Sequence, residues 1–138
     1  MIPIFYFNYK FFYDFRSLAL WSTLKKKPHY VVKEAHGLQE NSDPRWLTSV
    51  TALVNSDLVA TGSSDGYIRL WKAEFNDQKK ITPVFSIPVN GFINSLSFSS
   101  SGSHIIAGIG QEHKLGRWYK DKTCKNSIVI IPLKRKIL

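Results

Sequence analysis

The chain has 138 residues, of which 43% are hydrophobic and 14% aromatic, and Lys and Arg outnumber Asp and Glu by 19 to 10. This length accommodates one domain with a core but not two, and the composition excludes the aromatic-poor, charge-rich class of disordered chains. The formal charge of +9 favours polyanionic partners such as nucleic acid or an acidic membrane surface, the other interpretation being a solvated basic surface with no dedicated partner.

Residues 1–16, "MIPIFYFNYKFFYDFR", are crowded with aromatic rings. The segment has no basic start and no small-residue cleavage site. Lys10 and Asp14 interrupt it well before the roughly 20 apolar residues that cross a bilayer. We expect neither a signal peptide nor a membrane helix here, and we treat residues 1–16 as a segment distinct from the rest of the chain.

Three similar phrases recur further along, each ending in tryptophan and about 50 residues from the next: "SLALW" at Trp21, "GYIRLW" at Trp71 and "HKLGRW" at Trp118. Period-two patterning between turn residues predicts four strands in the central unit, at 46–54, 58–63, 67–73 and 82–89. The next unit has predicted strands at 92–99, 104–110, 114–120 and 126–133. In the first unit only "SLALWST" and "HYVVKEA" can be placed.

Four-stranded units of this length with a tryptophan on the third strand are typical of β-propeller blades. The chain resembles the WD-repeat proteins, so we expect an all-β fold, a partial WD-repeat β-propeller of about two and a half four-stranded antiparallel blades. The predicted boundaries are a half blade at 17–35 and full blades at 36–90 and 91–138. The resemblance implies a buried hydrogen-bond network within the central blade, formed by His36, Thr61 or Ser63, Asp65 and Trp71.

The stretch "GIGQEHKLGRWYK" at 108–120 is interpreted as a degenerate hairpin of the last blade. Glu112 stands where the repeat has aspartate, and Phe92 follows Gly91 where histidine is expected. Trp118 matches the repeat tryptophan and is predicted to lie in the core, whereas His113 is predicted to be exposed in a turn.

Other chemical interpretations fit less well. Gly108 and Gly110 lack the third glycine and the following helix that a dinucleotide-binding loop requires. The four histidines have no short ligand spacing, and the single cysteine, Cys124, excludes both a cysteine-based zinc cage and an intrachain disulfide. Ser99 does not lie in a nucleophile elbow. We expect no cofactor, no metal, no small-molecule substrate and no catalysis.

Aromatic and basic side chains are mixed in the C-terminal third, a combination that serves phosphate neutralisation and base stacking. Strand alternation directs Tyr119 and the lysines outward. The candidate RNA or partner contacts are His113, Lys114, Arg117, Tyr119, Lys120, Lys122 and Lys125.

Three phrases are more specific than the generic repeat: "ALWSTLKKKP", "LVATGSSDGYIRLW", and the run from "GFINSLSFSSSG" through "AGIGQEHKLGRWYK" to "NSIVIIPLKR". From residue 17 to about 136 the chain is similar to the C-terminal blades of the U3 small nucleolar RNA-interacting WD-repeat family. The resemblance implies a non-catalytic scaffold subunit of a box C/D small nucleolar ribonucleoprotein, which acts in pre-ribosomal RNA processing and small-subunit ribosomal RNA maturation. It also implies a location in the nucleus, within the nucleolus.

The partners implied are the box C/D small nucleolar RNA with its core proteins, and pre-ribosomal assembly proteins, with no membrane. The alternative is a generic WD-repeat adaptor that binds protein, with the positive charge incidental. A closed propeller needs at least about four blades, so we expect a fragment with exposed strand edges and blade faces that self-associates or dissolves poorly.

Overall fold

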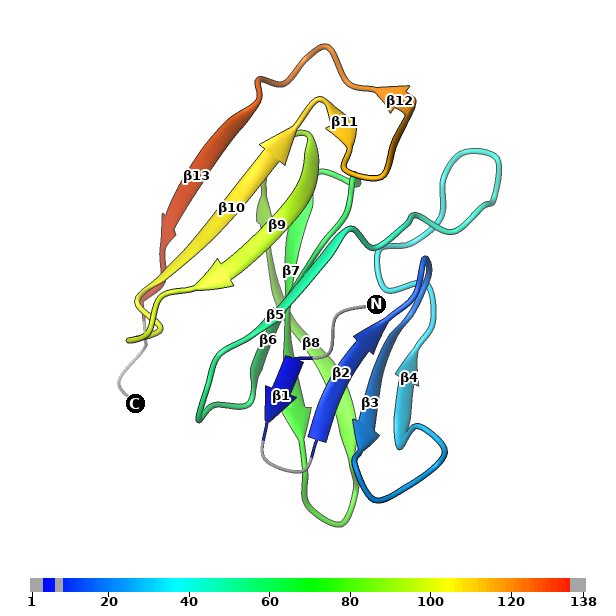
Figure 1. Ribbon diagram of the computed structural model, residues 1–138, viewed down its shortest axis with the longest axis vertical. Helices are drawn as coiled ribbons and strands as arrows, with labels where there is room; N and C mark the ends of the chain where they lie inside the picture. The colour runs from blue at the N-terminus through cyan, green and yellow to red at the C-terminus, as the bar shows by residue number, and fades with distance from the viewer. Residues whose placement is uncertain (1–3, 7–8, 135–138) are drawn as a thin grey trace.

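The computed structural model describes residues 4–6 and 9–134. In this part of the chain the strands form four antiparallel sheets that do not close into a ring, which confirms the predicted partial propeller (Figure 1). None of the described residues belongs to a helix long and apolar enough to traverse a lipid bilayer.

The first sheet has four strands, where the sequence predicted half a blade. It contains β1 (Ile4–Tyr6), β2 (Tyr9–Tyr13), β3 (Leu18–Ser22) and β4 (Tyr30–Val32), hydrogen-bonded in that order. Part of the aromatic N-terminal segment therefore joins the blade rather than standing apart from it. The physical reason is burial: Phe11 pairs with Leu20 across β2 and β3, and both side chains are almost completely buried. Residues 1–3 and 7–8 of that segment lie outside the described residues.

The second sheet forms the central blade and follows the sequence prediction closely. It contains β5 (Ser49–Ala52), β6 (Leu58–Gly62), β7 (Tyr67–Glu74) and β8 (Lys80–Pro88) in that order. The turns on either side of β6 each have a residue in the left-handed region, Asn55 at φ 58° before it and Gly66 at φ 87° after it.

The third sheet differs from the predicted four-stranded blade. Its order is β13-β10-β9, formed by β9 (Phe92–Phe98), β10 (His104–Gly110) and β13 (Ser127–Pro132). The predicted third strand at 114–120 is instead half of a separate hairpin, β11 (Glu112–His113) with β12 (Gly116–Lys120). The β-branched run of β13 supplies Val129 and Ile131 to the core, which a charged strand interrupted by glycine cannot match.

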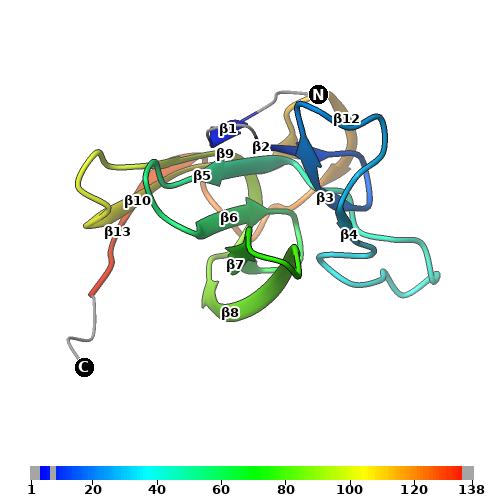
Figure 2. The same ribbon diagram turned by 90° about the horizontal axis from the view of Figure 1, so that it is seen from below.

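The three main sheets pack face to face, with the central blade between the other two (Figure 2). Phe11, Leu18 and Leu20 of the first sheet meet Val59 and other residues of the central blade. Ala60, Ile68 and Leu70 of the central blade meet five residues of the third sheet, namely Ile93, Leu96, Ile105, Ala107 and Ile109. Successive residues of β6 thus point to opposite cores, as the two-residue period of a strand requires.

Hydrogen bonds join the central blade to the third sheet around Ile93. The carbonyl oxygen of Ile93 accepts from Ser49 Oγ at 2.7 Å, and its amide donates to the Ser63 carbonyl at 3.1 Å. Gly62 lies in this contact, and a Cβ atom placed there would be 2.5 Å from Cγ2 of Ile93. The two sheets therefore approach closely because residue 62 has no side chain.

Candidate functional site

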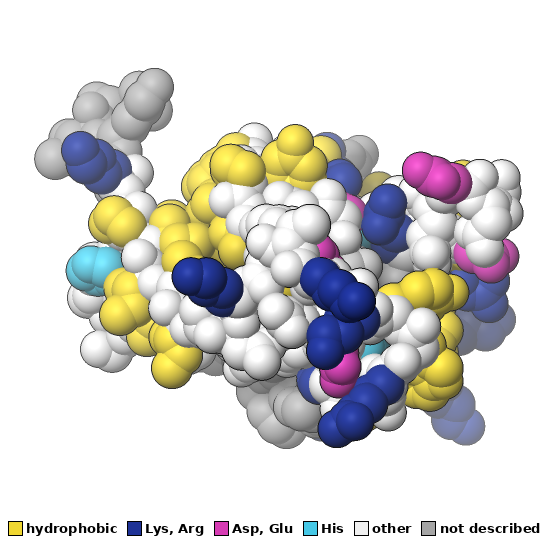
Figure 3. Space-filling view, turned by 90° about the horizontal axis from the view of Figure 1, so that it is seen from above, with side chains coloured by type: hydrophobic (Ala, Val, Ile, Leu, Met, Phe, Trp, Pro, Cys, Tyr) yellow, Lys and Arg dark blue, Asp and Glu magenta, His cyan; other side chains and the backbone are white. Residues whose placement is uncertain are grey.

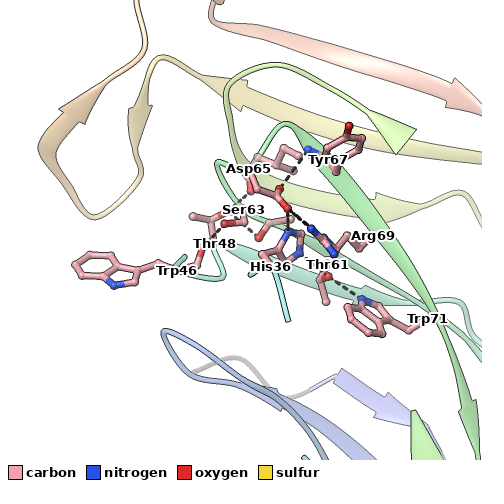
Figure 4. Close-up of polar contacts among 11 residues, drawn as sticks. His36, Trp46, Thr48, Thr61, Ser63, Asp65, Tyr67, Arg69 and Trp71 are labelled. Atoms are coloured by element: carbon pink, nitrogen blue, oxygen red, sulfur yellow. Dashed lines mark hydrogen bonds and ion pairs between the residues drawn. The ribbon is translucent and has the colours of Figure 1, made fainter. Parts of the chain in front are cut away.

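Four of the five predicted network residues form one buried chain of hydrogen bonds through the central blade (Figure 4). Trp71 Nε1 donates to Thr61 Oγ1 at 2.8 Å, and the same hydroxyl lies 2.8 Å from His36 Nε2. His36 Nδ1 is 2.9 Å from Asp65 Oδ2. Because Asp65 accepts, the His36 proton lies on Nδ1, and Nε2 is free to accept from the Thr61 hydroxyl.

Asp65 closes this chain and connects it to the adjacent strand. Arg69 donates to Asp65 Oδ2 through Nε at 3.0 Å and through Nη2 at 2.9 Å. Burial acts to raise the pKa of Asp65, but its hydrogen bonds and charge interactions with His36 and Arg69 outweigh burial and lower the pKa from its ordinary value. Asp65 is therefore an ionised anchor for both side chains at neutral pH.

Ser63, the fifth predicted member, lies outside this chain. Its hydroxyl donates to the backbone carbonyl of Trp46 at 2.6 Å, while the Trp46 ring points away from the network (Figure 4). Of the two alternatives, Thr61 on strand β6 thus occupies the network position, and Ser63, just after the end of β6, holds the segment that enters β5.

This arrangement is suited to holding structure rather than to reaction. Each donor in the series meets one acceptor, and His36 is 1% exposed, so no substrate reaches the imidazole. Within the described residues no group of three or more His, Cys, Asp or Glu side chains gathers around a possible metal position. The network joins the loop before β5 to β6, β7 and the turn between them.

The predicted contact residues gather at the end of the molecule that carries β11 and β12. Lys114, Arg117, Tyr119 and Lys120 lie on or beside this hairpin, Lys122 and Lys125 follow it, and all six are exposed. Figure 3 looks onto this end and shows Lys and Arg side chains spread across it. Glu112 Oε2 lies 3.4 Å from Arg117 and Oε1 lies 3.6 Å from Lys120, both at the solvent-exposed edge.

His113 and Trp118 differ from their predicted positions. His113 is buried, with 7% exposure, under the rings of Trp46, Phe92 and Trp118. Trp118 is 61% exposed instead of lying in the core. Both differences follow from the position of β13, which occupies the place beside β10 and leaves the hairpin outside the sheet.

Trp46 is a partner of this hairpin that the sequence pattern did not predict. Its ring contacts Trp118 with centroids 5.6 Å apart and His113 at the same separation, both edge to face. The available signal was that Trp46 is a tryptophan outside the register of the three repeat tryptophans.

Comparison with known proteins agrees with this geometry. A family model described as WD domain, G-beta repeat matches residues 33–72, which hold His36, Thr61, Asp65 and Trp71. The mouse and human proteins named U3 small nucleolar RNA-interacting protein 2 are each 49% identical over 125 residues. Those matches cover 88% of this chain and 26% of each relative. The Saccharomyces cerevisiae protein named Ribosomal RNA-processing protein 9 is 29% identical over 135 residues, covering 76% of this chain and 24% of that protein.

Two solved structures share the fold closely. The structure titled "Structure of U3-55K" superposes with a TM-score of 0.83 at 47% identity. The one titled "Crystal structure of RRP9 WD40 repeats" has a TM-score of 0.84 at 46% identity. Each match covers 91% of this chain and 38% of the solved chain.

The blade architecture, the buried network and the matched repeat define the chain as a WD-repeat β-propeller protein. More closely, it is homologous to the U3 small nucleolar RNA-interacting WD-repeat proteins, which confirms the resemblance predicted from the sequence. The chain spans about a quarter of the length of these relatives.

Proposed function

We propose that this chain acts in ribosome biogenesis, as a non-catalytic scaffold part of a box C/D ribonucleoprotein of the U3 type in the nucleolus. Its role there is to hold guide RNA and pre-ribosomal proteins together during processing of pre-ribosomal RNA and maturation of the small-subunit RNA. The observation that carries this proposal is 49% identity across most of the chain to proteins named for an interaction with U3 small nucleolar RNA.

The charge distribution supports RNA as a partner, bound either directly or together with its core proteins. The chain has a formal charge of +9, and six exposed basic or aromatic side chains gather around one hairpin. Such a surface neutralises phosphates and gives binding that weakens with salt. The absence of a catalytic role is part of the proposal, and the closed hydrogen-bond series around His36 supports it.

The test is an electrophoretic mobility titration of box C/D guide RNA, with and without its core proteins, at two salt concentrations. The chain is compared with a variant in which Lys114, Arg117 and Lys120 are each replaced by Gln. Each lost phosphate contact lowers the log-log salt slope by about 0.7 on single-stranded RNA, so we expect a decrease of about 2.

The matched control replaces Lys25, Lys26 and Lys27 by Gln, which removes the same charge. These lysines lie in the loop between β3 and β4, at the opposite end of the molecule from β11 and β12 (Figure 1). Equal weakening by both variants would mean that binding reports net charge alone. Salt-insensitive capture of a protein without RNA binding would favour the adaptor function instead.

A further inference from the structure

A small aromatic cavity lies between the central blade and the hairpin that follows β10. Its volume is about 220 Å³, below the roughly 300–1,000 Å³ of typical small-molecule sites, so it is sized for a single ring system. The residues that matter for recognition are Arg45, Trp46, Phe92, His113, Tyr119 and Lys120. They come from three separated segments, so only the folded chain forms this cavity.

The aromatic rings of this cavity form walls at steep angles to one another. Trp46 and His113 meet at 89°, and Phe92 and His113 at 75°. Tyr119 lines the same cavity and is 56% exposed. Trp46 also contacts Phe15 at 5.1 Å and Trp118 at 5.6 Å between ring centroids, so the more exposed ring of Tyr119 offers the more open face to a flat guest.

His113 lines this cavity and has a buried hydrogen-bond donor without a partner among the described residues. Its Nδ1 accepts from the Leu115 amide at 3.0 Å, so the proton of the neutral ring is on Nε2. That Nε2 is buried and has no hydrogen-bond partner among the described residues. Burial, followed by the charge of Lys114, lowers the pKa of His113 and keeps the ring neutral at pH 7. A buried donor without a partner is costly, and an acceptor on a bound ligand would remove that cost only after the rings that cover Nε2 move.

The charges around the cavity select an anionic ligand over a cationic one. Two cations, Arg45 and Lys120, line it with one carboxylate, Asp121, and Lys120 also lies 3.6 Å from Glu112 Oε1, so Arg45 contributes most of the positive charge that faces the cavity. Some aromatic cages bind methylated ammonium groups, which are cations. Here the lining cations and the +9 charge of the chain would repel such a ligand. A planar ring next to a phosphate satisfies both the aromatic walls and the basic rim.

We propose that this cavity holds one unstacked base of single-stranded RNA, with a ring face on Tyr119 or Trp46. Arg45 and Lys120 contact the adjoining phosphate. This inference rests on the proposed function, because that function makes RNA the ligand. It adds the form of the RNA that is recognised, which is an unpaired nucleotide and not a duplex.

The test measures binding of the 138-residue chain to fluorescein-labelled oligouridylate and oligoadenylate, and to a fully paired RNA hairpin. Trp46→Leu and Tyr119→Leu each remove a stacking surface, and Tyr30→Leu removes a comparably exposed tyrosine from β4 as the control. Loss of one stacked base corresponds to about 5- to 150-fold weaker binding. We expect this loss for single strands, with an unchanged salt slope, and no loss for Tyr30→Leu. Far-UV circular dichroism verifies that each variant is folded, and Tyr119→Leu remains informative if Trp46→Leu is not.

The outcomes separate the two proposals. If the unmodified chain binds single-stranded RNA with a steep salt dependence, but Tyr119→Leu binds like Tyr30→Leu, the cavity is not a base-binding site while the proposed function stands. Equal affinity for the paired hairpin also overturns the cavity proposal. If the chain binds no RNA at low salt, the proposed function itself loses its basis.

Discussion

Replacing Thr61 by Val tests the buried network at its centre. Valine has nearly the shape of threonine but lacks the hydroxyl that accepts from Trp71 Nε1 and donates to His36 Nε2. Both ring nitrogens lose their partner inside the core, because Thr61 is completely buried and His36 nearly so. The change therefore removes two hydrogen bonds without creating a large cavity.

The expected loss is large compared with the stability of a domain. A buried polar atom left without a partner costs about 1–3 kcal/mol, so two such atoms give about 2–6 kcal/mol. Whole domains are stable by only about 5–15 kcal/mol. Thr61→Ser retains the hydroxyl and removes one methyl group, for which we expect a loss of about 1 kcal/mol.

Urea unfolding, followed by far-UV circular dichroism at low chain concentration, measures these differences. Thr82→Val is the matched control, since Thr82 lies on the outer strand β8 of the same sheet and its side chain is partly exposed. The reasoning fails if Thr61→Val lowers the free energy of unfolding no more than Thr82→Val does. It also fails if Thr61→Ser costs as much as Thr61→Val.

Three further predictions concern pH, the approach of the sheets and the exposed blade face. The lowered pKa of Asp65 means that its ionised form stabilises the fold above the ordinary pKa of 3.8, and that this contribution is lost as pH falls through the folded-state pKa. Urea unfolding midpoints measured from about pH 5 to about pH 3 should therefore fall less steeply for Asp65→Asn than for the unmodified chain. Equal slopes would contradict this. Gly62→Ala forces a methyl group into the contact between the central blade and the third sheet, so it should lower the free energy of unfolding in urea by about 1–3 kcal/mol. Gly108→Ala is the control and should cost less, because its added carbon lies 3.4 Å from its nearest neighbour. The reverse order would contradict the close approach of the sheets at Gly62. Ile128 and Ile130 are 75% and 64% exposed on the outer face of the third sheet, so the chain should self-associate in sedimentation velocity. Changing both residues to Thr should reduce this self-association. A monodisperse unmodified chain would contradict the prediction.

Much of the central blade was predictable because its signals are local. Alternation and turn residues placed β6 and β7, and the glycine of the Asp65–Gly66 turn has the left-handed backbone that such a hairpin requires. The resemblance to WD repeats also indicated which side chains form the network. It left Thr61 and Ser63 as alternatives, since both fall within the predicted strand 58–63 and only the packing of the His36 ring distinguishes them.

The first and last sheets were less predictable because they depend on contacts between distant segments. The aromatic N-terminal segment shows no repeat signature, yet Phe11 completes the core beside Leu18 and Leu20. Trp118 has the repeat spacing, yet it lies outside the third sheet. Pattern alone assigns such residues by analogy, whereas burial depends on which other segment competes for the same place.

The sequence by itself determined the class of this protein, because the network residues of the central blade stand at the positions of a WD repeat and need each other to satisfy buried polar atoms. Only the tertiary structure decided which of two strand-like segments, 114–120 or 127–132, pairs with β10. Both have strand patterns, and the segment with the larger apolar, β-branched face wins because it buries more surface against the central blade. That choice moves the hairpin outward and creates the aromatic cavity beside Trp46.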